Sequence, residues 1–326
     1  MHPAAEAAVL MKGNIMPKEP MIWASLMHLS YNMWCDHPHP DAEKNHTAFK
    51  PYLRCDTAMW RALTQKMAEA GMNMVVIDVG DGVRYDSHPE IAVKRAWSPG
   101  RLRRELARLR GLGLEPIPKL NFSTCHDAWL GPYSRCVSTD AYYAVCRDLI
   151  EEVATLFDKP RFFHLGMDEE TARHQTRWEY AVMRQHGLWW RDLHFYLDQV
   201  EKAGSRPWVW SDYIWSHTEE YLAKMPRHVL QSNWYYGASF SRKLHWVKAY
   251  LDLDAHGFEQ VPTGSNWVDP RNFERTVSYC RRQLDPDRLL GFMQSSWKPT
   301  LPDCLERHLA SIDQVARAIR KVEKRG

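Results

Sequence analysis

The sequence lacks the features that mark several specialised classes of protein. No uninterrupted apolar run approaches the ~18 residues that a membrane-spanning helix needs, so no membrane partner is expected. The 43 basic residues exceed the 40 acidic ones by only three, which gives no reason to expect nucleic acid as a partner. The seven cysteines are an odd number without a Cys-x-x-Cys pair. Reduced thiols are the simplest interpretation, and one to three disulfides remain an alternative.

A secretory signal is also missing from the start of the chain as written. Residues 1–20 do not combine a basic beginning with a long apolar core, and we interpret them as an N-terminal arm. The sequence therefore predicts a cytoplasmic protein, with secretion or export to the periplasm as the alternative if a signal has been removed. The hydrophobic content of 44% and the charged content of 25% are typical of a globular protein.

From residue 21 onwards the chain repeats one pattern, a short apolar run typical of a buried strand followed by a segment with helical periodicity. The strands are expected at 21–30, 72–79, 114–122, 161–168, 207–214, 229–236, 258–266 and 289–297. The helices are expected at 56–71, 98–113, 138–157, 188–203, 217–224, 241–251, 271–283 and 302–322. Alternating strands and helices predict a parallel sheet, and eight such units predict a closed (β/α)8 TIM barrel. We therefore expect residues 21–326 to form a single α/β barrel domain.

The fourth strand ends in three consecutive carboxylates, at residues 168–170. Side chains alternate along a strand, so His164, Gly166 and Asp168 should face the barrel interior or its mouth. Glu169 would face the opposite way if the strand stayed regular, and we expect the strand to end there and the loop to bring Glu169 over the mouth. Because barrels of this class carry their chemistry at the carboxyl ends of the strands, Asp168 and Glu169 are the candidate catalytic residues. The alternative is that they are solvated loop acids.

The other predicted strand ends carry carboxylates, amides and indoles. In chain order these residues are His28, Asn32, Asp78, Asp81, Asn121, His126, Trp210, Asp212, Trp215, Asn233, Trp234, Tyr235, Tyr236, Asn266, Trp267, Gln294, Trp297 and Lys298. Flat rings suit the faces of a pyranose, and acids and amides suit its hydroxyls, whereas a Gly-rich phosphate loop is missing. Acids crowded into an aromatic pocket would also have raised carboxyl pKa values, as a glycosidase requires. This rim predicts an oligosaccharide or glycoconjugate substrate.

The segment 163–169 resembles the His-x-Gly-Gly-Asp-Glu motif of glycoside hydrolase family 20, the β-N-acetylhexosaminidases. Segments 117–121, 210–212, 229–234 and 291–297, together with His126 and Trp129, are similar to that family's third, fifth, sixth and eighth strands. The resemblance implies that Glu169 is the general acid/base and that Asp168 orients the substrate's 2-acetamido group. The acetamide oxygen then attacks the anomeric carbon, so the protein supplies no nucleophile.

On this basis we expect a retaining glycosidase that needs no metal or other cofactor. The candidate substrate-binding residues are Asn121, His126, His164, Trp210, Asp212, Trp234, Tyr235, Trp267 and Trp297. His164 has an alternative interpretation as a structural hydrogen-bonding residue behind the site.

The sequence also departs from the family pattern. Met167 replaces the second glycine of the motif, Lys119 and Asn121 replace the third-strand acids, and Lys298 stands where the family has an acid. No arginine closes the first strand. The tyrosine that would bond the acetamide could be Tyr235, Tyr236 or, less well, the Trp267 position. These departures predict a divergent member in which the catalytic pair is kept and the residues that grip the sugar are changed.

Three other functions are compatible with the sequence. The first is a retaining glycosidase that acts on sugars without a 2-acetamido group and uses a protein nucleophile such as Asp212. The second is a metal-dependent hydrolase using His28, His164 and Asp168, although these residues lack a His-Glu-x-x-His spacing. The third is a sugar-binding barrel that has lost its chemistry.

Overall fold

A computed structural model describes residues 20–324 of the chain and confirms the (β/α)8 barrel. All the strand pairs are parallel, in the order β6-β5-β4-β3-β2-β1-β8-β7. The strands are β1 (Ile22–His28), β2 (Met74–Asp78), β3 (Glu115–Lys119), β4 (Phe162–His164), β5 (Arg206–Trp210), β6 (Leu230–Ser232), β7 (Thr263–Ser265) and β8 (Gly291–Ser295). The predicted arm lies outside the described residues apart from Pro20, so the division into an arm and one barrel domain stays a prediction.

The barrel closes between β6 and β7 through single bridges rather than a long ladder. Gln231 pairs with Gln260, and Trp234 pairs with Thr263. The prediction of a strand over 258–266 was therefore too long, because only Thr263–Ser265 forms a regular strand. Pro262 offers a physical reason, since a proline has no N–H to donate to a neighbouring strand.

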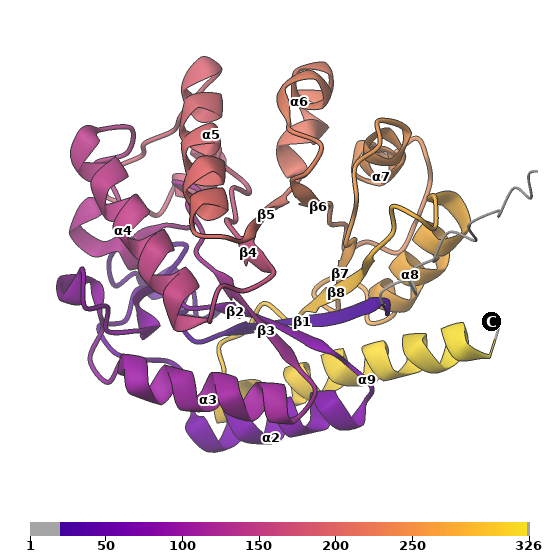
Figure 1. Cartoon of the computed structure of the whole chain (residues 1–326), viewed down its shortest axis with the longest axis horizontal. Helices are drawn as coiled ribbons and strands as arrows, with labels where there is room; N and C mark the ends of the chain where they lie inside the picture. Colours follow the sequence, from indigo (N-terminus) through magenta and orange to yellow (C-terminus); the bar gives the residue numbers. More distant parts are fainter. Residues whose placement is uncertain (1–19, 325–326) are drawn as a thin grey trace, which may run out of the picture.

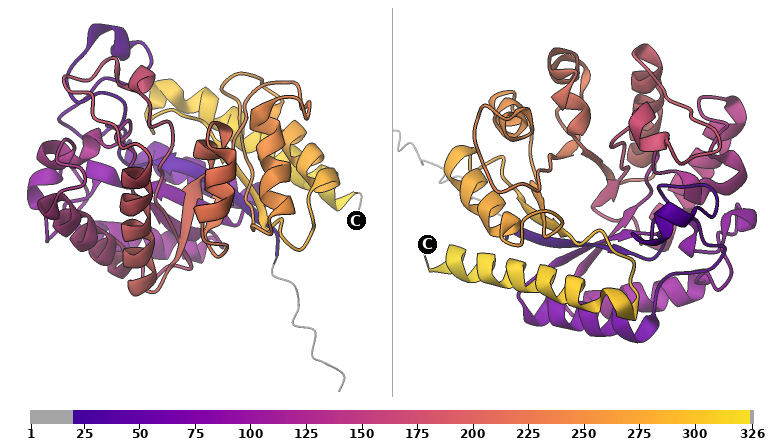
Figure 2. Two further views of the ribbon diagram at one scale, coloured as in Figure 1. Left: turned by 90° about the horizontal axis from the view of Figure 1, so that it is seen from above. Right: turned by 180° about the vertical axis from the view of Figure 1, so that it is seen from behind.

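Helices surround the strands in every view (Figures 1 and 2). They are α1 (Pro40–Glu43), α2 (Thr57–Glu69), α3 (Pro99–Gly111), α4 (Asp140–Leu156), α5 (Gly187–Lys202), α6 (Thr218–Lys224), α7 (His245–Ala255), α8 (Asn272–Gln283) and α9 (Leu305–Glu323). Six 3-10 helices lie in the loops of the described chain: η1 (Gly80–Gly82), η2 (Pro89–Ile91), η3 (Ala128–Tyr133), η4 (Ala172–Gln175), η5 (Asp212–Trp215) and η6 (Pro302–Cys304). All eight predicted helices are present, and α1 is an addition. Helix α9 packs beside α2, so the last helix completes the ring next to the first long one (Figure 1).

Local signals explain where these helices begin. The Asp56 carboxylate accepts the Met59 N–H at 2.7 Å and caps α2. The Ser98 hydroxyl accepts the Arg101 N–H at 3.3 Å, and Pro99 occupies the first turn of α3, where its missing N–H costs nothing. Residues next to each start in the sequence therefore mark where α2 and α3 begin.

Two hydrophobic layers hold the barrel. One fills the space between strands and helices, and the other fills the barrel interior. The interior layer consists of Ile22, Ala24, Leu26, Met74, Val76, Ile117, Phe162, Trp208, Trp210, Leu230, Val261 and Met293. Because this interior is packed with side chains, it is a floor under the strand ends and not a channel.

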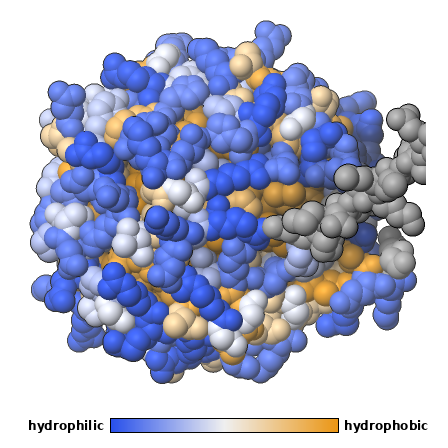
Figure 3. Space-filling model, in the orientation of Figure 1, coloured by the Kyte–Doolittle hydropathy of each residue, from blue (hydrophilic) through white to orange (hydrophobic). Residues whose placement is uncertain are grey.

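Hydrophilic side chains cover most of the face seen in Figure 3, and hydrophobic ones show mainly in the gaps between them. Among residues 20–324, none of the helices has the length and hydropathy needed to cross a membrane.

Candidate active site

The carboxyl ends of the strands surround a cavity of about 630 Å³. Its wall is mostly aromatic, and the two acids in it, Asp168 and Glu169, lie next to its one histidine, His126. The lining residues are Tyr31, Trp34, Thr47, His126, Asp168, Glu169, Trp215, Trp234, Tyr235, Tyr236, Gly237, Trp246, Trp267, Val268 and Trp297. A chamber of this volume and character suits a small, flat-faced polar ligand.

The backbone after β4 leaves the strand conformation and turns both acids toward the cavity. Gly166, Met167 and Glu169 have φ values of 71°, 75° and 56°, in the left-handed region. The structure thus confirms that the strand ends and that the loop brings Glu169 to the cavity. The strand itself ends at His164, earlier than predicted, because the left-handed residues break the extended backbone.

Asn121 holds this turn in place. Its side-chain oxygen accepts the Met167 N–H at 3.1 Å and the Ser123 N–H at 3.1 Å, and its amide donates to Asp168 Oδ1 at 2.8 Å. A Cβ atom on Gly166 would overlap the Asn121 side chain and come within 2.7 Å of the Asn121 Cα. Only glycine therefore lets the turn after β4 approach Asn121 this closely.

His126 lies between the two acids. Its Nδ1 is 3.2 Å from Asp168 Oδ1, and its Nε2 is 3.4 Å from Glu169 Oε2. Burial alone would lower the pKa of His126, but the two carboxylates outweigh it and raise the pKa to about 10. Burial would raise the pKa of Asp168, yet His126, Lys119 and Asn121 together hold it well below its usual range. At neutral pH the site contains a protonated imidazole and an ionised Asp168.

A second histidine lies beside the other carboxylate oxygen of Glu169. His174, from η4, places Nε2 3.4 Å from Glu169 Oε1, and its Nδ1 lies 2.8 Å from Thr171 Oγ1. The sequence analysis missed His174, since no periodicity or motif singles out a histidine in this long loop.

Asp212 lies beside the acid pair but does not line the cavity. Its Oδ2 accepts the Glu169 N–H at 2.8 Å, and its Oδ1 accepts the Trp234 indole N–H at 3.4 Å. Burial, together with the charges of Asp168 and Glu169, raises the pKa of Asp212 to about 8. Asp212 belongs to η5 and not to the predicted fifth strand, which ends at Trp210.

The remaining predicted site residues fall into two groups. Trp234, Tyr235, Trp267 and Trp297 line the cavity, as do His126 and both catalytic candidates. Asn121, His164 and Trp210, like Asp212, lie behind the wall.

His164 is buried and neutral. Its Nδ1 accepts the Gly166 N–H at 3.0 Å, and its ring packs against Trp208 and Trp210. Burial and then the Lys119 charge hold its pKa well below the usual value. This placement matches the alternative interpretation of His164 as a structural residue behind the site.

Several aromatic residues of the wall were not anticipated. Tyr31 and Trp34 come from the loop after β1, and Trp246 comes from α7. The Trp34 ring meets the His126 ring edge-on at 5.8 Å between centroids. The spacing Tyr31-x-x-Trp34, directly after a strand end, was the available signal for the first two.

Within the described residues, the three potential metal ligands considered from the sequence do not lie close together. Three groups of potential ligands converge to within 4.8 Å there: Cys35, Asp36 and His37; His46, Asp303 and Cys304; His126, Asp168 and Glu169. His28, His164 and Asp168 do not form such a group, so the alternative of a metal-dependent hydrolase using these residues has no support from the structure. His28 instead lies 3.8 Å from Asp78, which forms a fully buried ion pair with Lys119.

No protein-family model and no curated protein matches this sequence. Solved structures match in fold. A β-N-acetylhexosaminidase from Bacteroides fragilis NCTC 9343 aligns with 91% of this chain at 13% identity and a TM-score of 0.64. A GH20 exo-β-N-acetylglucosaminidase from Vibrio harveyi, in complex with N-acetylglucosamine, aligns with 91% at 14% identity and a TM-score of 0.57. A GH20 β-N-acetylhexosaminidase from Streptomyces coelicolor A3(2) aligns with 90% at 13% identity and a TM-score of 0.59. The chain spans 65%, 56% and 63% of these proteins' lengths, respectively.

Proposed function

We propose that the protein is a glycoside hydrolase of the β-N-acetylhexosaminidase type that uses substrate-assisted catalysis. One observation carries the proposal: Asp168 and Glu169, adjacent in sequence, both line an aromatic cavity beyond the end of β4 and lie 3.2 and 3.4 Å from the same imidazole, that of His126. The likeness of the barrel to GH20 enzymes supports it, as does the N-acetylglucosamine bound in the Vibrio harveyi structure.

In the first step Glu169 donates a proton to the glycosidic oxygen while the substrate's acetamide oxygen attacks the anomeric carbon. The bond to the leaving group breaks, and a positively charged oxazolinium ring forms. Asp168 Oδ1 is engaged by Asn121 and faces His126, whereas no hydrogen bond within residues 20–324 engages Oδ2. Oδ2 is therefore the oxygen that accepts the acetamide N–H and stabilises the developing charge.

In the second step a water molecule attacks the anomeric carbon and Glu169 removes its proton. The acetamide carbonyl is restored, and two inversions leave the β configuration unchanged. His126 and His174 flank the two oxygens of Glu169 and hold the carboxyl group in one orientation during both transfers.

Tyr236 is the better candidate for the tyrosine that bonds the acetamide oxygen. Its hydroxyl accepts the Trp297 indole N–H at 2.8 Å, which leaves its own proton free to donate. Burial raises its pKa well above the usual value, so the proton stays in place. The Tyr235 hydroxyl is packed against Gly237, where an added Cβ would overlap it.

The residues that differ from the family pattern lie around the expected sugar position, whereas the acid pair itself is kept. Lys119 neutralises Asp78 inside the barrel, and Asn121 holds Asp168. The Lys298 ammonium lies 5.6 Å from the centre of the Trp267 ring. A cation here, in place of an acid, predicts a substrate preference different from that of typical family members.

The rival with Asp212 as nucleophile has less support. A nucleophilic carboxylate must be ionised, and Asp212, whose pKa is raised to about 8, is mostly protonated at neutral pH. Both of its oxygens are also engaged by hydrogen bonds from Glu169 and Trp234.

The test is release of nitrophenol from aryl β-N-acetylglucosaminides, β-N-acetylgalactosaminides and the matching non-acetylated glycosides. Asp168→Asn and Glu169→Gln are compared with Glu151→Gln, an exposed carboxylate on α4. We expect turnover of acetamido sugars alone, inhibition by a thiazoline analogue, and at least a ~100-fold loss in both site variants but not in the control. Turnover of plain glycosides that thiazoline does not inhibit would favour the Asp212 rival. Glycan binding without turnover would favour a sugar-binding barrel.

A further inference from the structure

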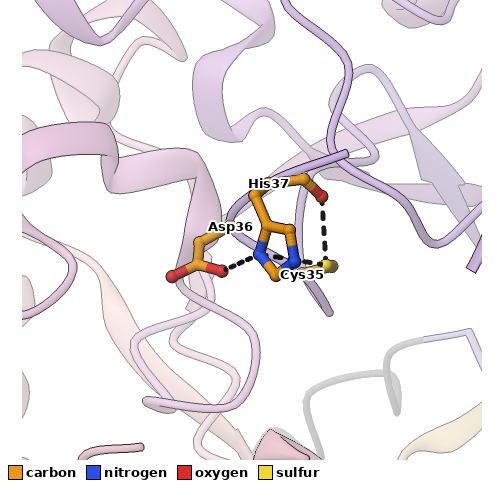
Figure 4. Close-up of side chains that lie close together, drawn as sticks. All are labelled: Cys35, Asp36 and His37. Carbon is orange, nitrogen blue, oxygen red and sulfur yellow. Dashed lines mark hydrogen bonds and ion pairs between the residues drawn. The ribbon is translucent and has the colours of Figure 1, made fainter. Parts of the chain in front are cut away.

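Three consecutive residues of the loop after β1 direct their side chains at one point (Figure 4). The Cys35 sulfur lies 3.9 Å from His37 Nδ1, and an Asp36 carboxylate oxygen lies 2.9 Å from the same nitrogen. Cys35 is fully buried, whereas Asp36 and His37 are partly exposed, so the group opens to solvent on one side. None of the three lines the cavity.

We propose that Cys35, Asp36 and His37 form a binding site for Zn²⁺. A thiolate, an imidazole and a carboxylate are ligands that zinc takes in proteins. Bonds of about 2.0–2.3 Å in tetrahedral geometry separate two ligand atoms by roughly 3.3–3.6 Å. Two of the three separations, 2.9 and 3.9 Å, lie on either side of that range, and all three potential ligand atoms lie within 4.8 Å of one another, so side-chain movements of about 1 Å admit the ion.

Binding of the ion involves no redox change. The zinc–sulfur bond forms as the Cys35 thiol releases its proton to solvent, and His37 binds through its unprotonated Nδ1. A water molecule completes the coordination, because His39, the other histidine of the His-Pro-His sequence, accepts the Asp41 N–H at the start of α1.

The site lies where two loops from distant strands meet. The Cys35 sulfur lies 3.1 Å from the His37 carbonyl oxygen and 3.2 Å from the Arg177 carbonyl oxygen, either of which can accept the thiol proton, and Asp36 accepts the Glu179 N–H at 3.2 Å. Trp34, next to Cys35, lines the cavity, and the β4 loop that carries Arg177 also carries His174. An ion at this point would therefore stabilise both loops that flank the acid pair.

The other two groups of potential ligands are less suitable. In the group of His46, Asp303 and Cys304, the Asp303 side chain is 63% exposed, and the positive charges of Lys298 and Arg54 act on His46. In the group of His126, Asp168 and Glu169, the imidazole is already protonated between its two carboxylates. A cation, Arg177, also acts on Cys35, but the Asp36 carboxylate is only 18% exposed against 63% for Asp303, and this is the reason for choosing the Cys35 group.

The experiment measures metal content and binding on the whole 326-residue chain. After dialysis against a chelator, the protein is titrated with Zn²⁺, and in parallel with Co²⁺, whose thiolate charge-transfer absorption reports a sulfur ligand. The variants are Cys35→Ser and His37→Asn, with the exposed Cys136→Ser as the matched control. Circular dichroism checks that each variant is folded, and the partly exposed His37 provides a test that does not disturb the buried thiol.

We expect one equivalent of Zn²⁺ per chain, a Co²⁺–thiolate band, and a higher unfolding temperature with zinc in the wild type and Cys136→Ser. Because losing an outer partner of a metal ligand already costs 10–100-fold in affinity, Cys35→Ser and His37→Asn should each weaken binding by more than ~100-fold. Failure of the wild type to bind zinc would overturn the proposal. Binding that survives both variants, or that is instead abolished by Cys304→Ser or His126→Asn, would also overturn it. None of these outcomes depends on the glycosidase activity.

Discussion

Replacing Gly166 by alanine tests whether the close contact between Asn121 and the turn after β4 positions the acid pair. The substitution has two costs. A left-handed φ of 71° costs an alanine about 1–2 kcal/mol. The added Cβ also overlaps the Asn121 side chain and lies 2.7 Å from its Cα, and forced overpacking of this kind costs about 1–3 kcal/mol. We therefore expect the free energy of unfolding to fall by roughly 2–5 kcal/mol.

Two control variants separate these costs. Gly113 has a φ of 78°, but a Cβ added there would have no atom within 4 Å, so Gly113→Ala shows the backbone cost alone. Gly187, in the first turn of α5, has neither a left-handed φ nor a close neighbour, so Gly187→Ala should be neutral or slightly stabilising. Urea denaturation of the three variants gives the comparison directly.

The same substitution should reduce activity. The Asn121 side chain can move away from the new methyl group only by releasing Asp168 Oδ1 and the Met167 N–H. Displacement of a catalytic group by about 1 Å can cost ~100-fold in rate, so we expect a loss of that order in kcat/KM for Gly166→Ala and no loss for the controls. If Gly166→Ala were no less stable than Gly113→Ala and fully active, the claim that Asn121 positions the acids would be refuted.

Three further predictions concern the ionisable groups of the site. His126→Asn removes a group whose pKa in the folded protein, about 10, exceeds its usual value of 6.5. The stability that this group contributes is complete below pH 6.5 and is lost as the pH rises through 10, so the difference in unfolding free energy between wild type and variant should shrink over that interval. A difference that stays constant with pH would contradict the raised pKa. Asp212→Asn should keep activity within about tenfold, whereas a protein nucleophile would lose at least ~100-fold, and azide rescue of a dead variant would identify the nucleophile. His174→Asn should alter the pH profile of kcat more than KM, because His174 contacts Glu169 Oε1; an unchanged profile would show that it only packs there.

The sequence by itself determined the architecture and the location of the acids. Alternating strands and helices and the Asp56 and Ser98 caps are local signals, and all the predicted strands and helices are present, although α7 begins at His245 and not at residue 241. Asp168 and Glu169 stood out because a carboxylate pair that ends a buried strand has no packing purpose. Strands β5, β6 and β7 are shorter than predicted, because a strand continues only as far as its neighbour continues to pair with it.

Only the tertiary structure decided how the acids are surrounded. His174, Trp34 and Trp246 approach the cavity from loops and a helix, and no local pattern encodes such contacts. The protonation states also came from the fold, because the pKa values of His126 and Asp212 depend on burial and on charges brought close by other strands. Local propensity determines which elements form, whereas the distances between side chains from different elements depend on how the whole barrel packs.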